Sequence, residues 1–87
     1  MPPDIASQIN AELSRRLAQE RVARGISKKK LAGLAGMDRT TVSFIEDPEK
    51  NPTIYNLIRY ALALEIDLGV LLSECVAEQG NREPKRR

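Results

Sequence analysis

Several residue types that carry chemistry are absent or scarce in this chain of 87 residues. It has no histidine and no tryptophan, and its only cysteine is Cys75. A lone cysteine cannot form an internal disulfide, which is typical of proteins from a reducing compartment. The cysteine has no partner base, and no glycine-rich phosphate loop or metal-spaced set of ligands is visible. We therefore expect neither catalysis, nor a metal site, nor a cofactor.

Long apolar runs are absent as well. No stretch of about 18 apolar residues could span a membrane, and the N-terminus does not have the pattern of a signal peptide. We therefore expect a cytoplasmic protein that does not associate with a membrane.

Aromatic residues make up only 3% of the chain, so its core must be aliphatic. Leu, Ile, Ala and Val recur at helical spacing, and no alternating run is long enough to indicate a sheet. The length suits one small domain without a sensor or catalytic domain beside it. We expect a single all-α domain over residues 1–80, followed by a disordered basic tail over residues 81–87.

Charge is distributed unevenly, although the net charge is only +2. Residues 15–39 carry eight Lys and Arg against two acidic residues, a balance of +6, whereas residues 40–80 have a balance of −5. One basic and one acidic side are typical of a domain that places one face on nucleic acid.

Residues 26–46 carry the clearest local pattern. Ser27 is a good N-cap and Gly36 a C-terminal stop for a short helix, and Asp38 can cap a second one. Met37 and Val42 flank that cap at the spacing of a hydrophobic staple. Two helices joined by a short turn of about 3–4 residues that contains glycine form a helix-turn-helix.

The identities of these residues, and of others along the chain, match a longer pattern. This longer pattern covers roughly residues 13–72 and consists of Leu31-Ala32, Ala35-Gly36-Met37, Val42, Ile45-Glu46, Asn51-Pro52-Thr53, Leu57, Ala61, Ala63-Leu64, Ile66 and Leu71. In these positions the chain resembles the phage repressor/Cro-type (XRE-like) helix-turn-helix family. The resemblance implies a compact five-helix, lambda-repressor-like domain whose second and third helices form the helix-turn-helix.

The first helix should run from a cap at Asp4 to about Arg24, with its buried stripe at Ile9, Leu13, Leu17 and Val22. This adds about two turns before the usual start of the family's first helix, which corresponds to Glu12. Those turns could lengthen the helix, pack on the C-terminal helix or contact a partner.

Two further helices are expected downstream, capped by Thr53 and Asp67. Their apolar faces are predicted at Ile54, Leu57, Ile58, Ala61 and Leu64, and at Leu68, Leu71, Leu72, Cys75 and Val76. Pro48 and Glu65 stand where the family commonly has glycine. We expect an altered path of the loop at Pro48, and either a different helix end or local strain at Glu65.

The second helix of the helix-turn-helix carries the candidate base contacts. With Val42 and Ile45 directed inward, helical geometry turns the opposite face outward, and that face consists of Arg39, Thr40, Ser43 and Phe44. Such a helix fits the major groove, where an arginine can bond guanine bidentately. Phe44 could contact thymine methyl groups, or instead pack on the scaffold or on another protein.

Phosphate contacts are expected at Lys28, Lys29, Lys50 and Asn51. Lys28, Lys29 and Lys30 begin a helix, where cations oppose the helix dipole unless an anion binds there. Lys29 and Lys30 could equally form a solvated face. In the loop before Lys50, the carboxylates of Asp47 and Glu49 should repel DNA.

The resemblance also implies a structural ion pair between Arg21 and Glu46 and binding as a homodimer. A dimer interface is predicted on the last helix at Leu72, Cys75 and Val76, with Tyr55, Tyr60 and Val70 as candidate edges.

These observations favour a sequence-specific regulator of transcription that binds double-stranded DNA as a dimeric repressor. An antitoxin with a toxin partner, or a controller protein of a restriction–modification system, are alternatives of the same class. A protein-interaction module that uses the fold without DNA is an alternative of another class.

Overall fold

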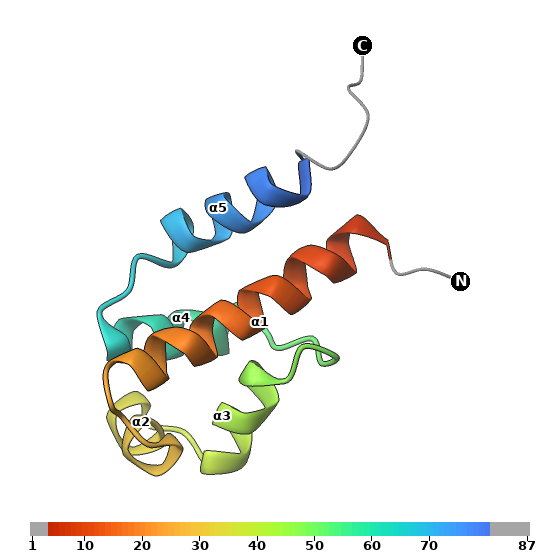
Figure 1. The fold of residues 1–87 in the computed structure, drawn as a ribbon. Coiled ribbons are helices and arrows are strands. Elements are labelled where there is room, and N and C mark those ends of the chain that lie inside the picture. The colour runs from red at the N-terminus through yellow and green to blue at the C-terminus, as the bar shows by residue number, and fades with distance from the viewer. Residues whose placement is uncertain (1–3, 81–87) are drawn as a thin grey trace.

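The computed structural model describes residues 4–80, which form five α-helices (Figure 1). They are α1 (Ile5–Ala23), α2 (Lys28–Ala35), α3 (Arg39–Glu46), α4 (Ile54–Leu64) and α5 (Leu68–Gly80). Within this part of the chain there is no strand, which confirms the expected all-α architecture. No helix of the described range has the length and apolar character to cross a membrane. The tail expected over residues 81–87 lies outside the described residues.

Side chains just before the helices fix where most of them begin. Each oxygen accepts a bond from the backbone N–H three residues on, at Asp4 (2.7 Å), Ser27 (3.0 Å), Thr53 (3.1 Å) and Asp67 (3.0 Å). These bonds satisfy N–H groups that have no partner within a helix. Asp38 precedes α3 in an extended conformation but makes no side-chain capping bond. The capped starts confirm the predicted boundaries, while α3 begins without its expected capping bond.

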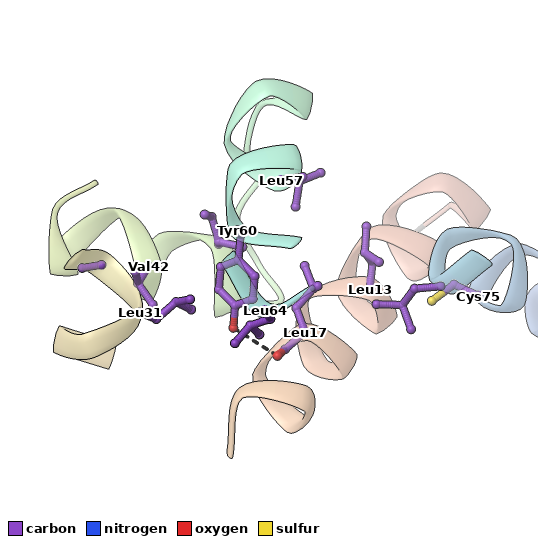
Figure 2. Close-up of a cluster of buried hydrophobic side chains, with 11 residues drawn as sticks. Leu13, Leu17, Leu31, Val42, Leu57, Tyr60, Leu64 and Cys75 are labelled. Carbon is purple, nitrogen blue, oxygen red and sulfur yellow. Dashed lines mark hydrogen bonds between the residues drawn. The ribbon is translucent and has the colours of Figure 1, made fainter. Parts of the chain in front are cut away.

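Tyr60 of α4 lies at the centre of the core (Figure 2). Its ring is completely buried and belongs to a cluster of buried apolar side chains that come from all five helices: Leu13, Leu17, Leu31, Val42, Ile45, Leu57, Leu64, Leu71 and Cys75. Tyrosine suits this place because it combines a large apolar ring with a hydroxyl that can find a partner. The expectation that Tyr60 borders a dimer interface is therefore wrong.

Two predicted apolar faces are confirmed in part, because each includes residues that lie outside the core. Val22 is 64% exposed, since it lies five residues after Leu17 and hence about 140° around the helix from it. On α4 the core face is made by Leu57, Tyr60, Ala61 and Leu64, so that Ile54 and Ile58 point to solvent.

The added N-terminal turns of α1 pack along α5, and the two helices lie side by side (Figure 1). Arg16 clasps them together through Glu12 (3.0 Å), Glu74 (3.2 Å) and Glu78 (2.5 Å). The hydrogen bond from Arg16 lowers the pKa of Glu12. Of the three roles open to these turns, two are observed: they lengthen α1, which begins at Ile5, and α1 packs on the last helix.

Cys75 is fully buried in this packing, and burial raises the pKa of its thiol. A side chain without exposed surface cannot contact a second subunit. The prediction of Cys75 at a dimer interface is therefore wrong. Val76 is exposed and Leu72 is half-buried.

Helices α2 and α4 end in the same left-handed conformation, at Gly36 (φ 67°) and Glu65 (φ 58°). In both, the following N–H bonds back to the preceding helix, from Met37 to Ala32 (3.0 Å) and from Ile66 to Ala61 (2.9 Å). Glycine suits Gly36 because it takes the left-handed conformation without strain, and an added Cβ would lie only 3.1 Å from the Arg59 guanidinium. Glu65 adopts the conformation that favours glycine, and strain rather than a different helix end is the outcome at this position.

We expect the substitution Glu65→Gly to raise the free energy of unfolding by about 1 kcal/mol, because it relieves the left-handed conformation. Urea denaturation measures the change. Glu65→Ala is the matched control, since it removes the same side chain but keeps the Cβ. Equal stability of the two variants would contradict strain at this position.

Candidate nucleic-acid interface

The outward face of α3 forms a shallow, open hollow of about 480 Å³. It is lined by all four residues expected to contact bases, together with one acidic neighbour: Arg39, Thr40, Ser43, Phe44 and Asp47. The face is turned outward because Val42 and Ile45, on the other side of α3, are completely buried. The structure thus gathers the predicted base-contacting side chains on one surface.

Phe44 is 43% exposed and does not fold into the core. Its ring lies among polar side chains in the hollow, so it offers an apolar contact there. The exposed part of Phe44 is available for contact with DNA or with another protein.

Lys28 lies next to this face. Its Nζ is 3.3 Å from Ser43 Oγ, which joins the first turn of α2 to the middle of α3. Lys29 and Lys30 instead line a separate shallow hollow with Ser27, Gly33 and Leu34. The three consecutive lysines therefore lie on different surfaces. Of the three, Lys28 is the one that hydrogen-bonds to a residue of the α3 surface.

The loop after α3 is held by α1. Asn10 donates its side-chain N–H groups to the Lys50 carbonyl (2.7 Å) and to Asn51 Oδ1 (3.2 Å). Asp47 Oδ1 accepts a bond from the Glu49 N–H (2.9 Å) within the loop. The Asn51 oxygen is thus already engaged, and neither Lys50 nor Asn51 lines the hollow on α3. Nothing in the local pattern around Asn10 indicated this contact, because its partners lie about 40 residues away.

The ion pair expected between Arg21 and Glu46 is present and bidentate. Arg21 Nε and Nη2 donate to the two carboxylate oxygens at 2.7 Å and 3.1 Å, and Nη1 donates to the Ile26 carbonyl at 2.8 Å. The two side chains are only 12% and 7% exposed. This pair joins the end of α3 to α1.

Tyr60 completes the network from α4. Its hydroxyl lies 3.0 Å from the Leu17 carbonyl (Figure 2) and 2.5 Å from Glu46 Oε2. Both neighbours are acceptors, so the single phenolic proton bonds one of them at a time. Burial raises the pKa of Tyr60 strongly, and the hydrogen bond to Glu46 adds to this shift. Sequence reasoning missed this role, since the spacing of Tyr60 identifies a helix face but not a hydroxyl partner.

No group of three or more Cys, Asp and Glu side chains able to hold a metal ion is found among residues 4–80.

Residues 17–71 match the helix-turn-helix protein family. Among solved structures, the chain is similar to the restriction-modification controller protein C.AhdI from Aeromonas hydrophila, with 32% sequence identity and a TM-score of 0.67 over 79% of this chain and 99% of that chain. It is also similar to the hypothetical transcription factor NHTF from Neisseria, with 32% identity and a TM-score of 0.64 over 83% of this chain and 80% of that chain. A comparison with curated proteins found no significant match.

We predict that stability falls at alkaline pH through Tyr60. In the unfolded chain its hydroxyl ionises near pH 10.0, whereas the folded protein holds the proton to higher pH. Above pH 10.0 the native state therefore binds more protons than the unfolded chain does. The free energy of unfolding then falls as pH rises, by at most about 1.4 kcal/mol per pH unit for this group. Denaturant titrations between pH 7 and pH 11 should show a weaker decline for Tyr60→Phe. An identical decline in both proteins would contradict the prediction.

Glu46→Ala should lower the free energy of unfolding by about 3 kcal/mol, because Arg21 is left buried without its partner. The matched control is Glu20→Ala. It breaks the exposed Arg24–Glu20 pair on the surface of α1 and should cost less than about 1 kcal/mol. Chemical denaturation measures both losses. If they were equal, the buried pair would not be what fixes α3.

Proposed function

The chain belongs to the helix-turn-helix family and is a DNA-binding regulator of transcription, and on this basis we propose that it acts as a sequence-specific, dimeric repressor that places α3 in the major groove. The observation that carries the proposal is the hollow on α3, where all four outward side chains meet. An α-helix fits the width of the major groove, and the start of a recognition helix meets the base edges.

The four outward side chains of α3 have three roles in this proposal. Arg39, at the first position of the helix, bonds O6 and N7 of a guanine, which is worth roughly 1–3 kcal/mol of discrimination. Thr40 and Ser43 are short enough to reach base edges or phosphates. Phe44 supplies the apolar surface that a thymine methyl group requires.

Lys28 is the principal phosphate ligand in this arrangement. It begins α2, where backbone N–H groups and the positive end of the helix dipole favour an anion, and it lies beside Ser43 of the base-contacting face. A phosphate bound there would fix the register of α3 in the groove. Lys29 has a secondary role at the edge of this site, because it lies in a different hollow.

The loop residues Lys50 and Asn51 have a weaker case as phosphate ligands. The Asn51 oxygen accepts a bond from Asn10, and Asp47 and Glu49 add negative charge in the same loop. Lys50 is exposed, and we place it as a phosphate ligand at the margin of the footprint.

Binding as a dimer follows from the size of the site. One recognition helix contacts few base pairs, so two copies that bind half-sites about one helical turn apart supply the required specificity. Repression by occupation of an operator needs no catalytic group, and we propose no enzymatic activity. We place the protein in the cytoplasm, where its DNA is accessible.

A controller protein of a restriction–modification system is the second candidate function. The similarity to C.AhdI, at 32% identity over 99% of that chain, favours it over the antitoxin alternative. The genes adjacent to the coding sequence decide between them, since a restriction enzyme beside it supports the controller and a small toxin supports the antitoxin.

Arg39→Ala should abolish selective binding while leaving helicity unchanged, because it removes the bidentate contact to guanine. A selection from random DNA, followed by fluorescence anisotropy on the selected site, measures the loss. The control is Arg15→Ala on α1, which removes an exposed arginine outside the α3 hollow. If Arg39→Ala kept full selectivity, the proposed base-contacting face would be incorrect.

Lys28→Ala should weaken binding to selected and random sequences alike, because it removes a phosphate contact. The slope of log K against log salt concentration should fall by about one unit. Titrations at several salt concentrations measure that slope. A loss of selectivity with an unchanged slope would instead make Lys28 a base contact.

A further inference from the structure

Asp47 is a charged residue on the α3 surface to which the proposed function assigns no contact. It follows the last residue of α3 and is half-buried. It lines the same hollow of about 480 Å³ as Arg39 and Phe44. DNA bound in this place would bring its own negative charge close to the carboxylate, so the presence of an acid on a DNA-binding surface requires a physical reason.

Hydrogen bonds hold Asp47 in one position. Its N–H donates to the Phe44 carbonyl (3.2 Å), its carbonyl accepts from the Lys50 N–H (3.1 Å), and its Oδ1 accepts from the Glu49 N–H (2.9 Å). The ring of Pro48 restricts the backbone of the same turn. No hydrogen bond or ion pair of Asp47 Oδ2 is found within residues 4–80. One oxygen of a fixed carboxylate is therefore available to a ligand.

The fold does not require the negative charge of Asp47. The turn needs only a side-chain oxygen, which asparagine supplies equally well. A carboxylate at the C-terminal end of a helix is unfavourable with respect to the helix dipole. The adjacent Glu46 is neutralised by Arg21, whereas Asp47 takes part in none of the ion pairs of the described residues. The charge therefore points to a ligand that donates a hydrogen bond.

We propose that Asp47 selects a cytosine in the bound DNA by accepting a hydrogen bond from its N4 amino group; the inference rests on the proposed function, which places α3 in the major groove. Of the groups that bases expose there, the amino groups of cytosine and adenine are the hydrogen-bond donors. The adenine amino group lies beside the N7 acceptor, which repels a carboxylate, whereas cytosine has no acceptor in that groove. Cytosine is therefore the base that fits.

The same carboxylate penalises other bases. Guanine exposes the N7 and O6 acceptors and thymine the O4 acceptor, so that Asp47 Oδ2 would face another acceptor at either base. The nearby phosphates would then repel the carboxylate without a compensating bond. Specificity is built from such repulsive contacts with the wrong partner as well as from attraction to the right one. A charge that opposes DNA binding in general thus becomes selective for one base.

Selection from random DNA with the wild-type protein and with Asp47→Asn tests the inference. Asparagine keeps the size of the side chain and an oxygen for the Glu49 N–H, so circular dichroism should show unchanged helicity. The wild type should select a cytosine that Asp47→Asn loses or exchanges for adenine, whose N6 and N7 suit asparagine. The affinity of the variant for random DNA should rise, because a negative charge is removed. Selection of the same bases by both proteins would overturn the inference.

Glu49→Gln is the matched control. Glu49 is an exposed carboxylate of the same loop, but it lines a different groove, together with Asn51 and Gln79. Its substitution removes the same charge, so affinity for random DNA should rise while the selected cytosine stays. If Glu49→Gln lost the cytosine as well, the charge of the loop and not the position of Asp47 would determine the preference, and the inference would fail.

A base analogue tests the bonded atom. Pyrimidin-2-one in place of the selected cytosine removes the N4 amino group. Wild-type affinity, measured by fluorescence anisotropy, should then fall by about 10-fold or more, since a hydrogen bond to a charged group is lost. Asp47→Asn should lose less than about 3-fold with the same duplex, because its remaining amide group is a donor. Equal losses for both proteins would contradict a bond between Asp47 and N4.

The selection also separates this inference from the proposed function. A wild-type protein that selects no sequence would overturn both, since every base contact then fails. A wild-type protein whose selected sequence depends on Arg39 but not on Asp47 would overturn this inference alone and leave the proposed function intact.

Discussion

The buried ion pair between Arg21 and Glu46 is the constraint on which the placement of α3 depends. Both charges are almost removed from water, so each needs the other and the hydrogen bonds around them. The pair connects α1 to the last residue of α3, and the Tyr60 hydroxyl adds α4 to the same network. A short helix of eight residues would be marginal alone, and these contacts hold it in one orientation.

The consequence is a division of tasks between the two helices of the helix-turn-helix. Val42 and Ile45 anchor α3 in the core, which leaves its opposite face free for a ligand. Lys28 contributes a cation from α2 at the side of that face. The long α1 contacts both α3 and the loop that follows it, since Arg21 bonds Glu46 of α3 and Asn10 bonds the Lys50 carbonyl of the loop.

Helix α4 contributes both to the core and to the turn between α2 and α3. Its inner face carries Tyr60 into the centre of the core, and Arg59 bonds the turn at Gly36 between α2 and α3. Its other side leaves the side chains of Ile54, Tyr55, Ile58 and Leu62 exposed.

The local pattern of residues was sufficient for the helices, for every predicted cap except Asp38 and for the family, because these depend on neighbours a few positions apart. The same pattern identified the outward side of α3, since burial of Val42 and Ile45 leaves only one other side. Long-range packing decided the rest. Helical spacing cannot determine which of two apolar sides of α4 meets the core, and it therefore placed Ile58 inside and Tyr60 outside. Only the fold brings Asn10 to Asn51, buries Cys75 against α1 and aims the Tyr60 hydroxyl at Glu46, because those partners are separated by many residues in the chain.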